Sequence, residues 1–129
     1  MKSKESELKA ITKAKDLTSY IMTVTQNSPK QFRFTFVSRL HNVSLDVLEE
    51  LILANEVFFS KDDPAGLRER LSYQRKAMSS LRLVSYFSMI AMEQKCITMR
   101  HYEMISSMVL DCQRLLGAWM SSDKKRLQS

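Results

Sequence analysis

The chain is poor in the residues that interrupt regular structure. It has only two glycines and two prolines among 129 residues. All-β folds need many tight turns, and those turns rely on glycine and proline. Their scarcity therefore argues against an all-β fold and favours long helices joined by few loops. Because 44% of the residues are apolar, we expect one globular domain over residues 1–129.

Secretory signals and long hydrophobic runs are also missing. The first ten residues, MKSKESELKA, contain no apolar core, so no signal peptide is expected. The least polar stretch, LVSYFSMIAM, is too short and too rich in serine to span a bilayer. The two cysteines then indicate free thiols in a reducing compartment. These features predict a cytoplasmic protein with no membrane partner.

The residue types that build catalytic and metal centres are few and scattered. His41 and His101 fall on different predicted helices, and neither has a Glu or His four residues later. Cys96 and Cys112 are sixteen residues apart and do not form a metal-ligand pair. We expect Cys112 in the core and Cys96 as an exposed thiol. The sequence has no phosphate-binding glycine loop and no nucleophile motif. We therefore expect a protein that is not an enzyme and that needs no metal or other cofactor.

Apolar residues recur at helical spacing in four segments separated by three short breaks. Ser28 is a candidate N-cap in the first break, with Pro29 at the first helical position. Asp63 and Thr98 are candidate N-caps for the two later helices. Short breaks favour antiparallel neighbours, so the predicted fold is an all-α, up-down-up-down four-helix bundle. The expected helices span about residues 5–26, 29–58, 64–92 and 99–122.

The second and third predicted helices carry apolar residues outside a single stripe. A helix of one bundle needs one buried stripe, so the extra apolar width indicates contacts between subunits. The alternative is a wide core stripe with a few scattered exposed apolar side chains. The residues concerned are Phe32, Phe34, Val43, Leu45, Leu83, Phe87 and Ile90. We expect self-association into a homo-oligomer.

Positive charge is concentrated on the third predicted helix. Twenty Lys and Arg against fourteen Asp and Glu leave a net charge of +6, which favours polyanionic partners. Arg68, Arg75 and Arg82 recur every seven residues, and a drift of about 40° over two heptads keeps them on one face. Such a row can contact several phosphates of RNA or DNA. The other candidate contacts are Arg70, Lys76, Lys30, Arg33 and Arg39.

The same bases have a second interpretation as a solvated face. In that case Arg68 and Arg70 pair with acids in the second half of the second helix, such as Glu50 and Glu56. Aromatic residues do not alternate regularly with the bases, so base stacking is not suggested. Binding is then expected to involve backbone phosphates with little sequence selectivity.

The segment RLLGAWM places Gly117 inside a helical pattern, where glycine costs roughly 1 kcal/mol relative to alanine. The only tryptophan, Trp119, follows two residues later. One interpretation is that Gly117 lets another helix of the same chain approach closely, with Trp119 packed beside that contact. The alternative is a glycine that merely loosens the last turn.

Several segments together resemble one family of small bacterial helical proteins. RLLGAWM is similar to that family's Arg-aliphatic-Leu-Gly-small-Trp-aliphatic ending. NSPKQFRFTFVSRL resembles its Pro-Lys…Arg-Phe-Thr start of the second helix. KDLTSYI, VLEELILAN and LRERLSYQRKAMSSLRL resemble other helical pieces in the same order. The resemblance covers about residues 10–122. The family includes the accessory variability determinants (Avd) of diversity-generating retroelements and proteins encoded in ribosomal RNA intervening sequences.

This resemblance implies a function without a catalytic centre. Accessory variability determinants form barrel-shaped homopentamers of four-helix bundles, bind the retroelement reverse transcriptase, and bind nucleic acid through a basic surface. They support the copying of a template-repeat RNA into cDNA. The ribosomal relatives imply the alternative, a structural oligomer with protein partners only. The arginine content of the third helix favours the retroelement branch.

Overall fold

The computed structural model describes residues 2–128 of the chain, and the side chains of residues 9–128. Within that part the chain is helical and contains no strand, so the prediction of an all-α fold is confirmed. The two short elements α2 and η1, the latter a π-helical turn, lead directly into α3. The elements are α1 (Lys2–Val24), α2 (Lys30–Phe32), η1 (Arg33–Val37), α3 (Ser38–Glu56), α4 (Pro64–Glu93) and α5 (Met99–Gln128).

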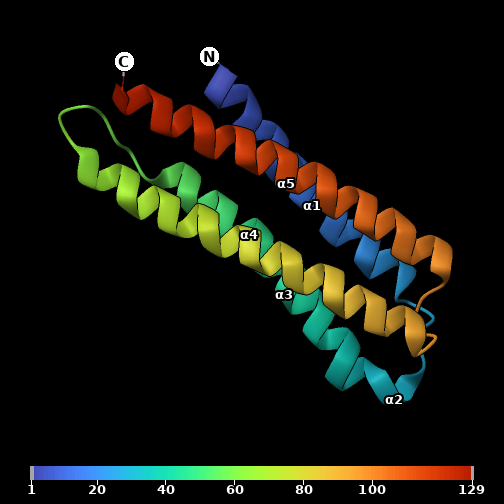
Figure 1. Cartoon of the computed structure of the whole chain (residues 1–129). Helices are drawn as coiled ribbons and strands as arrows, with labels where there is room; N and C mark the ends of the chain where they lie inside the picture. The colour runs from blue at the N-terminus through green and yellow to red at the C-terminus, as the bar shows by residue number, and fades with distance from the viewer. Residues whose placement is uncertain (1, 129) are drawn as a thin grey trace.

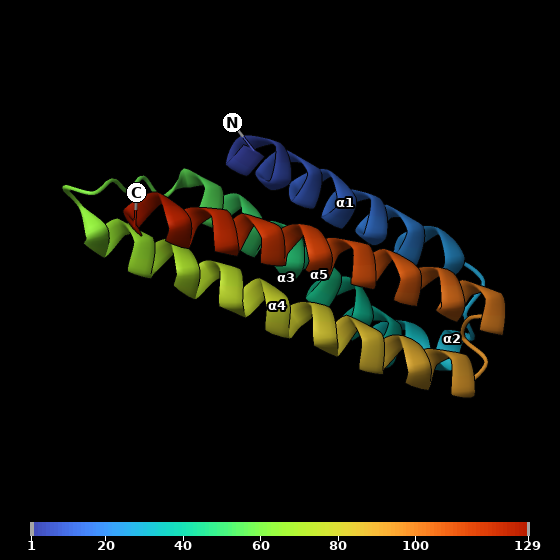
Figure 2. The same cartoon turned by 45° about the horizontal axis from the view of Figure 1, so that its top comes forward.

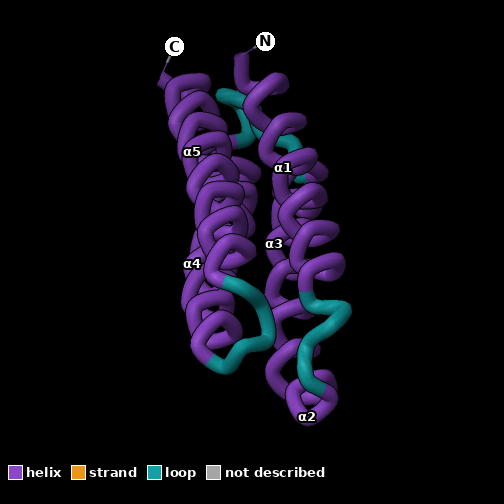
Figure 3. Tube along the Cα trace, turned by 90° about the vertical axis from the view of Figure 1, so that its right-hand side faces the viewer, coloured by secondary structure: helices purple, strands orange, loops and turns teal. Residues whose placement is uncertain are grey.

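The four long helices lie side by side along a common direction (Figure 1). The α3–α4 loop and both ends of the chain lie at one end of the molecule, whereas the α1–α2 and α4–α5 connections lie at the other (Figures 1 and 2). Viewed from the side, α1 lies beside α3 and α4 beside α5 (Figure 3). Helices α3 and α4 also contact each other, as do α1 and α5. Each long helix therefore has two neighbours and turns one face toward a shared core.

The core follows the apolar periodicity of the sequence. Along α5 the buried seam runs through Ile105, Val109, Cys112, Leu116 and Trp119, at spacings of three and four. These side chains meet the apolar stripes of α1, α3 and α4 in one continuous cluster. A second, smaller cluster lies beneath the α3–α4 loop and contains Phe59, Leu67 and Leu71.

Two of the three predicted N-caps occupy the first position before a helix, and one does not. The Thr98 hydroxyl accepts a hydrogen bond from the His101 N–H (3.1 Å), and the Thr98 N–H donates to His101 Nδ1 (3.2 Å). This reciprocal pair confirms Thr98 as the cap of α5. Asp63 precedes α4, but its side chain makes no capping hydrogen bond within the described residues. The prediction for Ser28 is wrong, because its hydroxyl donates to the Cys96 carbonyl (2.8 Å) and joins the two loops.

Two predicted helix boundaries need correction. The helix expected over residues 29–58 is interrupted by η1 and ends at Glu56. A π-helical turn contains an extra residue, which rotates the side chains that follow it. The last helix continues past residue 122 to Gln128. It does so because Asp123 is buried against α4 and Leu127 packs against the Phe59 cluster.

The additional apolar residues of the second and third predicted helices divide into two groups. Val43 is buried, and Phe32 and Phe87 pack half-buried against the core, so a wide stripe accounts for these three. The others are exposed in the single chain: Phe34 (94%), Leu45 (42%), Leu83 (43%) and Ile90 (40%). Among residues 2–128, none of the helices combines the length and apolar character that crossing a bilayer requires.

Candidate nucleic-acid interface

Three basic residues of α4 that were predicted to contact nucleic acid line one hollow on the side of α4 that faces α3. Arg68, Arg75 and Lys76 are exposed and line it together with Ser72 and Ser79. Arg68 and Arg75 are seven residues apart and therefore lie on nearly the same face of the helix, whereas Lys76 is the next residue and lies on an adjoining face. No salt bridge among the described side chains involves any of the three bases. The hollow has a volume of about 550 Å³ and is open to solvent on its outer side.

The α3 wall of this hollow carries a half-buried acid, Glu50. The Ser80 hydroxyl donates to Glu50 Oε1 at 2.8 Å. Burial is the main cause that raises the pKa of the Glu50 carboxyl, while the Ser80 hydrogen bond and the charge of Lys76 oppose that rise. The hollow is therefore basic along α4 and acidic at one point on α3, which reduces its attraction for phosphate below that of a purely basic groove.

Arg82 does not line this hollow, so the hollow brings together only two of the three arginines of the predicted row. It is exposed, but it lines a separate hollow between α4 and α5, together with Tyr86, Tyr102 and Gln113. A spacing of seven residues falls short of two full helical turns by about 20°. Over two heptads this drift amounts to about 40°, and Arg82 lies beside the α5 side chains Tyr102 and Gln113 rather than in the hollow that Arg68 lines.

The bases at the start of α3 form a third group at the opposite end of the molecule. Lys30, Arg33 and Arg39 are all exposed. Lys30 belongs to α2, Arg33 to η1 and Arg39 to the first turn of α3, and α2 lies far from the α3–α4 loop that precedes Arg68 (Figure 1). The Arg33 Nε donates to the Ser28 carbonyl at 3.3 Å. Arg39 lines a mainly aromatic hollow whose other residues are Phe32, Thr35, Phe36, Phe87 and Gln94.

Arg70 is a core residue, so its prediction as a surface contact is wrong. Only 6% of Arg70 is exposed. Its Nε donates to Asp123 Oδ2 at 2.8 Å and its Nη2 donates to Oδ1 at 3.2 Å. The guanidinium also lies over the rings of Phe59 (5.3 Å) and Trp119 (5.0 Å). The alternative pairing of Arg70 with the acids of the second helix is therefore wrong as well, because its partner lies on α5.

Asp123 and Gln74 were not predicted, although the sequence carries a signal for both. Asp123 is fully buried and also accepts a hydrogen bond from Gln74 Nε2 at 3.0 Å. The buried seam runs through Cys112, Leu116 and Trp119 at alternating spacings of four and three residues. The next spacing of four, from Trp119, reaches Asp123, which continues the seam. Gln74 likewise falls between the buried Arg70 and Ala77 of α4. A prediction that ended the last helix at residue 122 could not place an acid on this seam.

The structure separates the roles expected for Gly117 and Trp119. Trp119 is completely buried on the α5 seam. Gly117 makes no close approach: beyond its own helical turn, no described atom lies within 4 Å of the position of a Cβ there. The expectation of an adjacent helix at Gly117 is therefore wrong for the single chain, and so is a loosened last turn, because α5 continues to Gln128. The close-approach glycine is Gly66, where a Cβ would overlap the Phe58 carbonyl oxygen.

Both cysteines are buried. The prediction for Cys112 is confirmed: its thiol donates weakly to the Ala10 carbonyl (3.8 Å), and burial raises its pKa to about 12. The prediction of an exposed Cys96 is wrong, because the loop that carries it turns inward where Ser28 bonds to its carbonyl. Within the described part of the chain, no group of three or more His, Cys, Asp or Glu residues is arranged to hold a metal ion.

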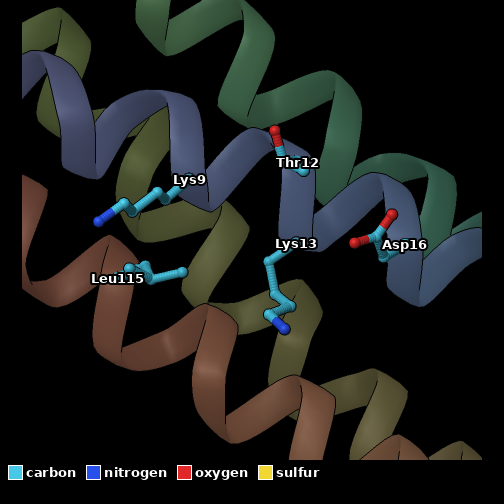
Figure 4. A pocket seen from close by; sticks show the side chains of 5 residues that line it. All are labelled: Lys9, Thr12, Lys13, Asp16 and Leu115. Atoms are coloured by element: carbon cyan, nitrogen blue, oxygen red, sulfur yellow. The ribbon is translucent and has the colours of Figure 1, made fainter.

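A further pair of bases lies on the other side of the molecule, between α1 and α5. Figure 4 shows the side chains of Lys9 and Lys13 extending from α1 toward α5, near Leu115. Lys13 Nζ lies 3.8 Å from Asp111 Oδ2, and Asp16 lines the same hollow. This charge is partly neutralised, so the α4 bases remain the stronger candidates for an anion.

Neither the comparison with protein-family models nor that with curated proteins gives a match to this chain.

Proposed function

We propose that the chain is a non-catalytic accessory protein that binds the phosphate backbone of RNA and DNA. The observation that carries this proposal is the cluster of Arg68, Arg75 and Lys76 around one hollow, exposed and without a salt bridge to any described side chain. Arg68 and Arg75 are separated by ~10 Å along α4. That span corresponds to about three phosphates of one strand.

The resemblance extends this proposal to a specific setting. We propose that the protein acts in the cytoplasm with the reverse transcriptase of a diversity-generating retroelement and supports the copying of template-repeat RNA. We further propose that the antiparallel bundle assembles as a homopentamer. The exposed apolar side chains of η1, α3 and α4 support self-association, because an interface that covered them would remove their apolar surface from water.

A second candidate function is a structural oligomer that binds only protein. The acid Glu50 in the wall of the basic hollow favours this alternative, because a carboxylate repels phosphate. The two candidates differ in one measurable property, which is the contribution of Arg68 and Arg75 to nucleic-acid binding.

The deciding experiment compares two double variants that remove the same charge from different places. Arg68→Gln with Arg75→Gln removes two bases from the hollow, whereas Lys124→Gln with Lys125→Gln removes two exposed bases from the last turns of α5. Both variants should fold, because exposed charges contribute little to stability. Only the first should weaken the binding of unrelated RNA and DNA sequences, and it should flatten the salt slope by ~0.7 to 0.9 per lost contact. If both variants lose the same nucleic-acid affinity, binding depends only on the net charge of the protein, and the proposed interface is wrong.

The partners are tested separately. Light scattering coupled to size exclusion should give a mass near five times 15.0 kDa, and a monomer at micromolar concentration would refute the assembly. Co-purification with the reverse transcriptase, with RNA retained or digested, tests the polymerase contact. If the polymerase is not retained under either condition, the structural alternative is favoured.

A further inference from the structure

The hollow between α4 and α5 combines an arginine with two tyrosines from different helices. Arg82, Ser85, Tyr86 and Met89 contribute from α4, and Tyr102 and Gln113 contribute from α5. Its volume is about 340 Å³. Tyr86 is 65% exposed, so most of its ring is accessible in the single chain. Among the described side chains, one cation and no carboxylate line this hollow.

We propose that this hollow binds an unpaired base of a single-stranded nucleic acid. The nucleobase stacks on the Tyr86 ring, and Arg82 contacts an adjacent phosphate. This proposal departs from the sequence-based expectation of no base stacking, because Tyr86 follows Arg82 by four residues on α4 and lines the same hollow. This inference rests on the proposed nucleic-acid binding and adds to it a preference for single strands. Every base has a π face that can stack on an aromatic ring, whereas in a duplex that face is covered by neighbouring bases.

The remaining side chains of the hollow suit this ligand. The Gln113 amide offers both a donor and an acceptor, which matches the polar edges of a base. No salt bridge among the described side chains involves Arg82. The acids of the adjoining segments, Glu93, Glu103 and Asp111, do not line the hollow, and Asp111 pairs instead with Lys13. The hollow is therefore positive at one edge and aromatic beside it.

The other aromatic hollow, at the start of α3, is a weaker candidate. There the Arg39 guanidinium already lies 5.9 Å from the Phe87 ring centroid. Phe36 and Phe87 meet edge to face at 6.3 Å, and both rings are half-buried. These contacts occupy ring surface that a base would need, whereas the Tyr86 ring is largely open.

The test measures binding of labelled single-stranded and duplex oligonucleotides, each as RNA and as DNA. Tyr86→Ala should weaken single-strand binding by roughly 5- to 150-fold, the range for loss of one stacked base. The same change should leave duplex binding nearly unaltered. Tyr86→Phe keeps the ring and should bind as the parent does, and Phe58→Ala serves as a matched control because Phe58 is an exposed aromatic at the other end of the bundle. Fluorescence of the buried Trp119, ~25 Å from Tyr102 along α5, reports whether each variant is folded.

Photo-crosslinking locates the stacked base. A single 4-thiouridine in the RNA, or 5-bromodeoxyuridine in the DNA, should crosslink to a peptide containing Tyr86 or Tyr102, and the two arms show which nucleic acid is used. If the parent binds single strands but Tyr86→Ala binds equally well, or if the crosslinks map to the peptide that contains Phe36, this inference is wrong while the proposed function stands. If the parent binds no nucleic acid, both are overturned.

Discussion

Replacing Asp123 with alanine is the most informative perturbation of the fold. Asp123 is fully buried, and its carboxylate accepts hydrogen bonds from Arg70 Nε, Arg70 Nη2 and Gln74 Nε2. Its Oδ1 also lies 3.6 Å from the Arg126 guanidinium. Alanine in its place leaves the Arg70 charge buried between Phe59 and Trp119 with its principal carboxylate partner removed.

The expected loss in the free energy of unfolding is large, because the Arg70 guanidinium stays charged and buried away from water. Breaking a buried ion pair from one side costs about 3–5 kcal/mol. A domain of this size has a free energy of unfolding of about 5–15 kcal/mol, so the change removes a large fraction of it. Asp111→Ala is the matched control on the same helix. Its partner Lys13 is 3.8 Å away and both side chains are partly exposed, so it should lose less than about 1 kcal/mol.

Urea unfolding monitored by Trp119 fluorescence measures both changes, since this residue is the only tryptophan in the chain. A double variant, Arg70→Met with Asp123→Leu, should recover most of the lost stability, because apolar residues of similar size often replace a buried ion pair without loss. If Asp123→Ala is no more destabilising than Asp111→Ala, the pair is not desolvated and the account of Arg70 as a core residue is wrong.

Two further predictions concern the glycines and the thiols. Gly66→Ala should destabilise the fold by about 1–3 kcal/mol, because the added Cβ meets the Phe58 carbonyl oxygen. Gly117→Ala should stabilise the fold by up to ~1 kcal/mol, because the position has room for a Cβ and alanine has the higher helix propensity. Urea midpoints in the opposite order would contradict this reasoning. Cys112 has a folded pKa of about 12, above its ordinary 9.0, so the unfolded chain loses this proton first and stability should fall as pH rises above about 9. Native Cys112 should also resist thiol reagents at pH 8, and rapid labelling without unfolding would refute its burial.

The sequence alone determined the positions of the long helices and much of the core. Local chemistry is sufficient for this, because Pro64 begins a helix, Thr98 caps one, and apolar spacing along α5 marks the seam that buries Trp119. It did not determine the π-helical turn at Arg33–Val37, since the hydrogen bonding of one turn depends on how Phe36 and Val37 pack against the core.

Only the tertiary structure decided which charges and glycines face solvent. Arg70 and Arg68 are two residues apart on one helix, but Arg70 is buried because α5 places Asp123 against it. The sequence pattern favoured a close approach of another helix at Gly117, but the close approach occurs at Gly66, where the α3–α4 loop crosses the start of α4. Arg82 gains Tyr102 as a neighbour only because α5 lies beside α4. Each of these outcomes depends on side chains far apart in the chain, which no local pattern records.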